Sequence, residues 1–308
     1  MRIALIHTRI RVEERLLIEA FGARGIDVEV IDVRSEVFDA RSRERWLGFD
    51  AVLDRCVSLT ASLNVTRILD SWGVRCVNRP GAIAVCSDKL WTNVELDRAG
   101  LPTPGYAVGV SPESGLAAAE RVGYPAVFKP TVGSWGRLVS RANDRDAGEA
   151  IIEHRSVLGS PAHGVHYVQE HVDKPGRDLR AFVIGGRVIA AIARSSGHWV
   201  TNTARGATVE GIELDGEARD LSERAAAAVG ADICAVDLFE CPSRGILVNE
   251  INHSLEFRNS IEPTGVDIPG EIVGEVVRAA GVDSSESCPT KSENNSSESC
   301  PTRTGAPA

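Results

Sequence analysis

The stretch Ala235-Val-Asp-Leu-Phe-Glu-Cys-Pro-Ser-Arg-Gly-Ile-Leu-Val-Asn-Glu-Ile-Asn-His253 carries most of the information about the fold. Apolar runs flank the turn residues at 242–245, a pattern typical of two antiparallel strands joined by a tight turn. If the two central turn residues form the loop, Asp237 lies opposite Glu250, and Asn252 shares the face of Glu250. Two carboxylates facing each other on an apolar sheet repel unless a cation lies between them. Oxygen-only ligands suit Mg²⁺, so the hairpin predicts a metal–nucleotide site.

The composition is typical of a soluble globular protein. The chain has 308 residues, of which 43% are hydrophobic and 25% charged, enough for two or three domains. It contains no apolar run long enough to cross a bilayer and no recognisable signal peptide, so we expect a cytoplasmic protein without membrane contact. The net charge of −9 disfavours nonspecific binding to nucleic acid.

Lysine is rare in this chain, and its few positions are therefore informative. Lys and Arg together number 34, but only four are lysines: Lys89, Lys129, Lys174 and Lys291. A compact ammonium and a planar guanidinium are not interchangeable at a phosphate. We therefore expect the remaining lysines to include positions where the ammonium itself is required.

The first part of the chain alternates short apolar runs with helical periodicity, which predicts a parallel α/β domain over residues 1–86. No GxGxxG follows the first strand, so a dinucleotide-binding role is not indicated. The expected strands lie at 3–7, 28–33, 51–53 and 74–78, and the expected helices at 13–24 and 59–72.

The next helix is expected from a Ser87 cap to about Ala99, with Lys89 in its first turn. A cation at that position opposes the helix dipole unless an anion lies nearby. A solvated lysine at a helix start is an equally good interpretation.

Beyond residue 106 the pattern becomes α+β. Expected strands lie at 126–130 and 167–172, a hairpin turns at Gly185-Gly186, and expected helices lie at 219–229 and 268–280. We expect a central subdomain at 87–168, a C-terminal subdomain at 169–283 and a disordered tail at 284–308. The tail repeats Ser-Ser-Glu-Ser-Cys-Pro-Thr, and its polar composition cannot form a core.

A glycine-containing loop at 131–137 follows the strand that carries Lys129. Its backbone N–H groups can surround phosphates, although two glycines alone are a weak signal. Lys129 among apolar neighbours adds weight, because a buried ammonium needs a counter-charge. The pair Gln169-Glu170 could recognise an adenine amino group or a ribose hydroxyl, but by itself it is equally typical of a solvated strand edge.

Taken together, these residues resemble the ATP-grasp ligases in their order and spacing. Within that superfamily the chain resembles the RimK-type branch, specifically the LysX/ArgX ligases that act with the carrier protein LysW. The resemblance covers about residues 1–282 and lies in the runs Asn78-Arg-Pro80, Gly133-Ser-Trp-Gly-Arg137, Pro175-Gly-Arg-Asp178, Trp199-Val-Thr-Asn-Thr-Ala-Arg-Gly206, Glu256-Phe-Arg-Asn-Ser260 and Thr264-Gly-Val-Asp-Ile-Pro-Gly270.

The resemblance implies a fold with α/β and α+β parts, an ATP-grasp fold preceded by a Rossmann-like (pre-ATP-grasp) domain. It also implies a set of site residues. ATP would lie between two antiparallel sheets, contacted by Lys89, Lys129, Gly133, Ser134, Trp135, Gly136, Arg137, Gln169, Glu170, His171, Val172 and Asp178. Mg²⁺ would be ligated by Asp237, Glu250 and Asn252. Catalysis would use Arg194 and Arg205, and substrate binding would add Asn202, Asn259 and Ser260.

The implied reaction is formation of an amide bond between a carboxylate and an amine, driven by ATP through an acyl phosphate. The acceptor would be the side chain of the C-terminal glutamate of LysW, and the amine would come from glutamate or 2-aminoadipate, in arginine or lysine biosynthesis. Asn259-Ser260 resembles the aminoadipate type, but such members can use both amino acids. The family also implies a homodimer or homotetramer.

Two alternatives remain open at this point. One is a RimK-like ligase that adds glutamate to another protein or to a cofactor. The other is a nucleotide-binding regulator without turnover, which the complete set of two carboxylates and an asparagine disfavours.

Overall fold

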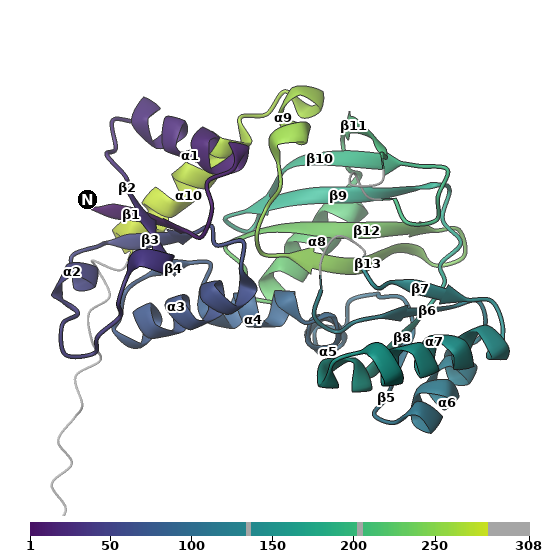
Figure 1. Cartoon of the computed structure of the whole chain (residues 1–308). Helices are drawn as coiled ribbons and strands as arrows, with labels where there is room; N and C mark the ends of the chain where they lie inside the picture. The colour runs from purple at the N-terminus through teal and green to yellow at the C-terminus, as the bar shows by residue number, and fades with distance from the viewer. Residues whose placement is uncertain (134–136, 202–205, 283–308) are drawn as a thin grey trace, which may run out of the picture.

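The computed structural model describes residues 1–133, 137–201 and 206–282, which form three sheets with helices packed on them (Figure 1). The predicted tail at 284–308 lies outside the described residues.

The N-terminal sheet is parallel and has the strand order β2-β1-β3-β4. All five residues of β1 are buried, as expected for a strand covered on both faces. The predicted parallel α/β domain is thus confirmed. Its elements are β1 (Ile3–His7), α1 (Val12–Ala23), β2 (Glu29–Asp32), a 3₁₀ turn (Val33–Ser35), α2 (Glu44–Leu47), β3 (Ala51–Asp54), α3 (Leu59–Ser71) and β4 (Cys76–Val77).

Two helices, α4 (Pro80–Ser87) and α5 (Lys89–Arg98), lead out of this sheet. The prediction that Ser87 caps the second helix is wrong. Ser87 ends α4, and its hydroxyl donates to the carbonyl oxygen of Ile83 at 2.7 Å. Asp88 has extended backbone and caps α5 instead, accepting the N–H groups of Leu90 and Trp91.

The second sheet is antiparallel, with the order β5-β8-β6-β7, and α6 and α7 pack on it. The expected boundary between residues 168 and 169 falls inside β8, whose whole length pairs in this sheet, so a division after Glu170 agrees better with the pairing. The elements are β5 (Tyr106–Gly109), α6 (Pro112–Val122), β6 (Ala126–Lys129), β7 (Ser140–Ala142), α7 (Arg145–Leu158), a 3₁₀ turn (Pro161–Gly164) and β8 (His166–Glu170).

The third sheet is also antiparallel, with the order β11-β10-β9-β12-β13. The predicted turn at Gly185-Gly186 is confirmed: both residues have positive φ, at 57° and 76°, a conformation that favours glycine. The elements are β9 (Arg177–Ile184), β10 (Arg187–Ser195), β11 (Thr208–Ile212), α8 (Gly216–Ala228), β12 (Ile233–Cys241), β13 (Gly245–Asn252), α9 (Arg258–Thr264) and α10 (Ile268–Val282).

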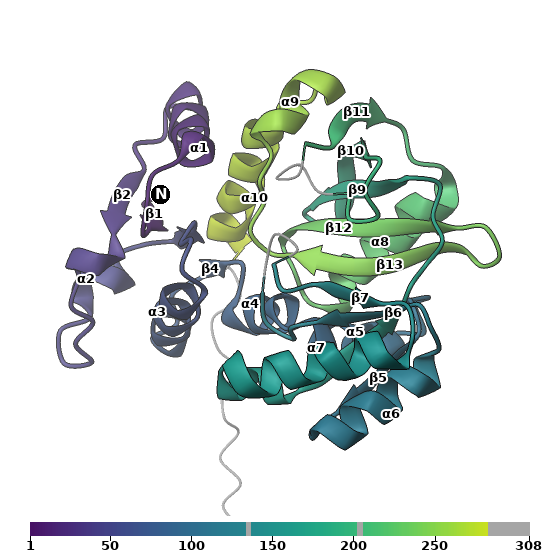
Figure 2. The same ribbon diagram turned by 45° about the vertical axis from the view of Figure 1, so that its right-hand side comes forward.

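The last helix joins the first and third sheets into one body. Figure 2 shows α10 lying between the N-terminal sheet and the five-stranded sheet. Its residue Ile272 belongs to the same buried cluster as Leu5, Phe21 and Ile184. The end of the described chain therefore returns to the beginning, and one continuous core spans the two parts.

The hairpin of β12 and β13 reaches the predicted register by a different route. Cys241 pairs with Gly245, so the turn contains three residues rather than two. The register then shifts between Asp237 and Leu238, because Asn249 is an extra residue that forms a bulge in β13. The longer turn and the bulge compensate, and Asp237 lies opposite Glu250 as predicted.

Among the described residues, no helix has the length and apolarity needed to cross a membrane. The cysteines of these segments are all buried and form no disulfide: Cys56, Cys76, Cys86, Cys234 and Cys241.

Candidate active site

Lys129 links the two antiparallel sheets. It ends β6, and its ammonium donates to Oε1 of Gln169 on β8 at 2.5 Å and to Oδ1 of the bulged Asn249 on β13 at 3.0 Å. Burial lowers the pKa of Lys129 to about 8, opposed by the nearby charge of Glu250. The bulge thus supplies an acceptor to a cation that the apolar surroundings would otherwise disfavour.

Lys89 connects the predicted phosphate loop to the hairpin. Its ammonium donates to the carbonyl oxygen of Gly133 at 2.6 Å and lies 3.2 Å from Oε1 of Glu250. Its own N–H donates to the carbonyl oxygen of Thr131, so the start of α5 is attached to the loop at two points. The Lys89 side chain is only 13% exposed. The solvated-lysine interpretation is therefore wrong. The negative charge of Glu250 compensates for the unfavourable interaction between the Lys89 ammonium and the start of the helix.

The carboxylate of Asp237 is buried and surrounded by donors. Arg180, directly opposite on β9, forms a two-point ion pair with it at 2.7 and 2.8 Å. Arg194 lies 3.2 Å from Oδ2, and the amide of Asn252 lies 3.5 Å from the same atom. Burial opposes ionisation, but the two guanidinium groups hold the pKa of Asp237 below its usual range.

Protein cations therefore balance the paired carboxylates: two arginines for Asp237 and Lys89 for Glu250. Our sequence-based reasoning missed Arg180. The signal was available, because Arg180 lies two residues after Asp178 at the start of the predicted hairpin, and antiparallel pairing aligns it with Asp237. Asp237, Glu250 and Asn252 share one face and offer only oxygen ligands, which fits a hard divalent cation. Among the described residues no group of three His, Cys, Asp or Glu side chains is arranged to hold a metal ion.

Arg194 lies between two aspartates. Its Nε donates to Asp178 at 2.8 Å, and its Nη2 lies 3.2 Å from Asp237. Burial disfavours the charged guanidinium, yet the two carboxylates raise its pKa further above the ordinary value. Asp178 also accepts the Thr201 hydroxyl and lies 3.5 Å from the ammonium of Lys174. Lys174 and Thr201 are members of this network that the sequence did not reveal.

The predicted adenine segment is divided by the end of β8. Gln169 is buried and donates to the Tyr167 hydroxyl at 3.2 Å, besides accepting from Lys129. Glu170 accepts the backbone N–H of Gly105 at 2.7 Å and forms an ion pair with Arg244. Both side chains are thus engaged with protein groups.

His171 and Val172 follow the strand rather than belonging to it. Val172 is buried against Leu247 in a small apolar cluster of the third sheet. The His171 ring lies 5.9 Å from that of Trp199, and its Nε2 lies 3.3 Å from Arg141.

Several predicted site residues cannot be compared with the structure. Ser134, Trp135, Gly136, Asn202 and Arg205 lie outside the described residues. Arg137 resumes the described chain and is exposed. Asn259 and Ser260 belong to α9, which packs beside β10 and β11. Asn259 is exposed and Ser260 is buried, and no hydrogen bond within the described segments joins either side chain to the Asp237 cluster.

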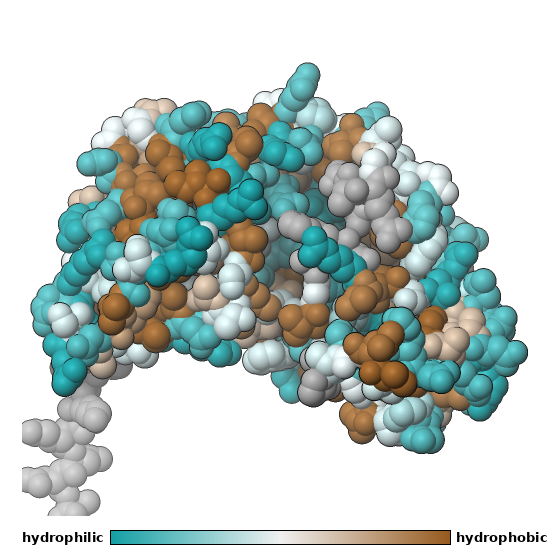
Figure 3. Space-filling view, viewed as in Figure 1, coloured by the Kyte–Doolittle hydropathy of each residue, from teal (hydrophilic) through white to brown (hydrophobic). Residues whose placement is uncertain are grey.

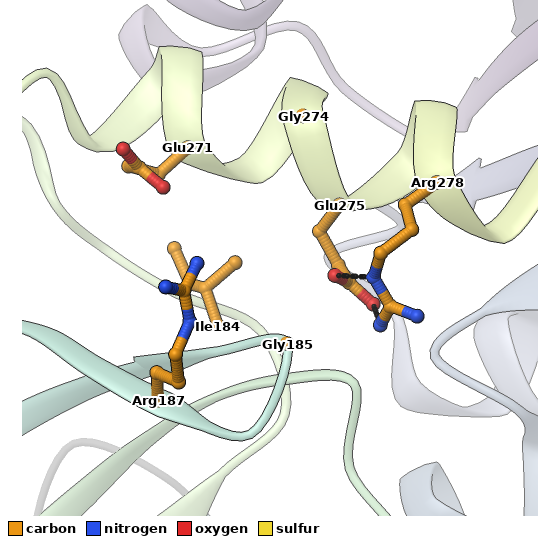
Figure 4. Close-up of a pocket in the computed structure, with 7 residues that line it drawn as sticks. All are labelled: Ile184, Gly185, Arg187, Glu271, Gly274, Glu275 and Arg278. Atoms are coloured by element: carbon orange, nitrogen blue, oxygen red, sulfur yellow. Dashed lines mark hydrogen bonds and ion pairs between the residues drawn. The ribbon is translucent and has the colours of Figure 1, made fainter.

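A separate pocket of about 400 Å³ lies away from these residues, where the Gly185 turn meets α10 (Figure 4). Two of its charged side chains, Glu275 and Arg278, pair with each other at 2.9 Å. In contrast, the face in Figure 3 is hollowed near its middle, between the N-terminal part and the antiparallel sheets, and the hollow is lined mainly by polar residues. The contacts of Lys129, by comparison, join the two antiparallel sheets.

The protein has two antiparallel sheets that Lys129 bridges, and the hairpin of the second of these sheets carries a pair of acids. This arrangement defines an ATP-grasp enzyme. Residues 3–85 match the family model of the LysX preATP-grasp domain, and residues 86–276 match that of the RimK-like ATP-grasp domain.

The curated relatives agree with this class. The chain is 34% identical over 279 residues to "Glutamate--LysW ligase ArgX" of Sulfolobus acidocaldarius, a match covering 90% of this chain and 98% of the relative. It is 31% identical over 281 residues to "Alpha-aminoadipate--LysW ligase LysX" of Sulfurisphaera tokodaii, again covering 90% and 98%. A crystal structure of a RimK domain ATP-grasp protein from Sphaerobacter thermophilus superposes with a TM-score of 0.74 at 30% identity, covering 90% of this chain and 100% of that one. The chain belongs to the LysX/ArgX family of RimK-type ATP-grasp ligases, and it is an enzyme.

Proposed function

We propose that this enzyme joins the α-amino group of glutamate or 2-aminoadipate to the side chain of the C-terminal glutamate of a LysW-type carrier protein, with ATP and Mg²⁺. The observation that carries the proposal is the meeting of Asp237, Glu250 and Asn252 on one face with Lys89 and Lys129 beside them. The relatives named as LysW ligases, matched over nearly their whole length, support the carrier as acceptor.

Nucleotide binding would use the lysines as phosphate ligands. Lys129 already lies between the sheets, and Lys89 already touches the loop at Gly133. The loop residues Gly133–Arg137 would close over the phosphates, and Gln169–Val172 would border the adenine. Because the Glu170 carboxylate is held by Gly105 and Arg244, we expect it to support the adenine pocket rather than to contact the base itself.

The acidic set fits a divalent cation by its donor chemistry. Asp237, Glu250 and Asn252 would hold Mg²⁺, which when bound offsets charge on the phosphates. The arginine and lysine side chains that pair with Asp237 and Glu250 in this structure would then either share these carboxylates with the metal or move to contact the phosphates.

The reaction would proceed in two displacements. An oxygen of the acceptor carboxylate attacks the γ-phosphorus of ATP, ADP leaves, and an acyl phosphate forms. The amine then attacks the acyl carbon, inorganic phosphate leaves, and the amine loses a proton. Positioning and charge neutralisation supply most of the rate enhancement in such transfers.

Arg194 is suited to stabilise negative charge during the second displacement. Its Nε and Nη2 are held by Asp178 and Asp237, which fixes the guanidinium in place. Among the described residues Arg194 Nη1 has no hydrogen-bond partner, so its N–H groups can donate to a substrate oxygen. We propose that Arg205 shares this role and that Asn202, Asn259 and Ser260 bind the amino acid.

The substrates differ by one methylene, a difference worth only about 1–3 kcal/mol in a pocket. We propose that the enzyme accepts both amino acids and acts in arginine or lysine biosynthesis, as a cytoplasmic homodimer or homotetramer. We further propose that the chain has four parts. Their expected bounds were 1–86, 87–168, 169–283 and 284–308, and the pairing of β8 favours ending the second part at Glu170.

The test is incubation of the enzyme with purified LysW-type carrier, ATP, Mg²⁺ and each amino acid in turn. We expect the carrier to gain the mass of one glutamyl or aminoadipyl residue, and phosphate release to require carrier and amino acid together. Phosphate release with glutamate and a different acceptor, without modified carrier, would indicate the RimK-like alternative. ATP binding with no phosphate release under any combination would indicate a regulator.

A further inference from the structure

Asn78 connects the N-terminal sheet to the hairpin that carries the acidic set. It directly follows β4, and only 5% of its surface is exposed. Its Oδ1 accepts the N–H of Ile233 at 2.9 Å, and its Nδ2 donates to the carbonyl oxygen of the same residue at 2.8 Å. The second Nδ2 contact reaches the carbonyl oxygen of His253 at 2.9 Å.

These bonds lie at the open end of the hairpin. The pairing of β12 with β13 ends at Ala235 and Asn252, so Ile233 lies just beyond the last pair on one strand and His253 on the other. The Asn78 side chain occupies the place that another β13 residue would take in the ladder, binding both polar groups of Ile233. It thereby sets the distance between the two strands next to Asn252.

Arg55 acts on the same segment. It is 3% exposed, donates from Nη2 to the carbonyl oxygen of Leu255 at 2.9 Å, and pairs through Nε with Glu14 at 3.0 Å. Two side chains of the N-terminal part therefore hold alternate carbonyl groups, at residues 253 and 255, in the segment that leaves Asn252.

We infer that Asn78 is a positioning residue for the metal site. It holds Asn252 at the correct distance from Asp237 across the end of the hairpin, and Arg55 supports it. Through these bonds the N-terminal part, which supplies none of the proposed metal ligands, sets the affinity for the divalent cation. Outer contacts of metal ligands commonly change affinity about 10–100-fold when they are lost. This inference rests on the proposed function, because it assumes that Asn252 is a ligand.

The experiment measures Mn²⁺ affinity of the full-length protein in the presence of ADP by electron paramagnetic resonance, without turnover. We expect Asn78→Ala to weaken Mn²⁺ binding about tenfold. Arg55→Lys keeps a positive charge beside Glu14 but loses the second nitrogen that donates to the Leu255 carbonyl, so we expect it to weaken Mn²⁺ binding as well. The matched control is Thr66→Val, which removes a buried hydrogen bond to Ser62 in the same part of the chain without touching the hairpin. The control should stay folded, as thermal unfolding will show, and keep its Mn²⁺ affinity.

The outcomes separate the inference from the proposed function. Wild type that binds ADP but no Mn²⁺ would overturn the metal site and this inference with it. Wild type that binds Mn²⁺, together with a folded Asn78→Ala of unchanged affinity, would overturn the inference alone. If Asn78→Ala does not fold, Arg55→Lys decides the question, and unchanged affinity in that variant overturns the inference.

Discussion

The carboxylate of the single residue Glu250 pairs with the Lys89 ammonium in this structure and, in our proposal, also binds a divalent cation. Its side chain is 25% exposed, and the Lys89 ammonium retains the carbonyl of Gly133 when the carboxylate is replaced. Replacement by an amide should therefore be tolerated by the fold but not by the reaction.

We predict that Glu250→Gln abolishes ADP formation while its thermal unfolding stays close to that of wild type, because the amide keeps the shape and loses the charge that holds the metal. Asp220→Asn, on the exposed face of α8, is the control for removing a carboxylate elsewhere. Activity within about tenfold of wild type would remove Glu250 from the metal site.

The lowered pKa of Lys129 makes both the stability of the fold and the charge of the site depend on pH. Burial lowers its pKa from 10.5 to about 8, so the folded chain loses this proton before the unfolded chain does. The folded state therefore disfavours the ammonium. This penalty is fully present below about pH 8, fades as the pH rises toward 10.5, and is absent well above 10.5, where both states are neutral.

We predict that ADP affinity, measured by calorimetry in the absence of amino acid, falls above about pH 8, because neutral Lys129 no longer attracts phosphate. Lys129→Arg should retain its charge and move this fall to higher pH. An ADP affinity that stays constant through pH 10 in wild type would show that Lys129 does not contact phosphate.

At the scale of elements, the start of α5 determines where Lys89 points. Asp88 caps the helix, and the backbone N–H of Lys89 is bound to Thr131 of the loop. The Ser87 hydroxyl instead donates to the carbonyl oxygen of Ile83 in the preceding helix. A bond from a serine hydroxyl to the carbonyl four residues earlier contributes little to helix stability.

We predict that Asp88→Ala lowers the free energy of unfolding by about 1 kcal/mol, because two N–H groups of α5 lose their acceptor. Ser87→Ala, the neighbouring control, should change it far less. Urea unfolding compares the two variants, and an equal loss in both would contradict the assignment of Asp88 as the cap.

Element boundaries were largely predictable, but caps and bulges were not. The periodicity predicted β1 and β6 to within one residue and the hairpin at Gly185-Gly186. Alternation along a strand is a local signal, whereas the choice between Ser87 and Asp88 depends on where the chain leaves one helix axis for the next. The bulge at Asn249 likewise depends on its pairing with β12 and on the Lys129 ammonium, whose hydrogen bond the Asn249 side chain accepts.

In the molecule as a whole, α10 returns the chain to the N-terminal sheet and packs in a core that this sheet shares with the five-stranded sheet. The matched family models end at residue 276, within this helix. The repeated tail therefore lies beyond the part of the chain that the family comparison accounts for.

We predict that deleting residues 284–308 leaves kcat and the thermal unfolding midpoint unchanged, because a Ser-, Pro- and Asn-rich segment has too few apolar groups to pack. The comparison is carrier modification by the shortened and full-length enzymes under the same conditions. A large loss of activity would give the repeated segment a functional role.

The hairpin, its two acids and asparagine on one face, and the resemblance to the LysX/ArgX family could be read from the amino-acid order, because side-chain alternation and motif spacing are properties of nearby residues. The folded chain was needed to show which cation accompanies each acid: Arg180 and Arg194 at Asp237, and Lys89 at Glu250. It also showed that Asn78 closes the end of the hairpin. These partners lie on distant strands and helices, and a charge is balanced by whichever group the folded chain brings within a few ångströms, not by its neighbours in the sequence.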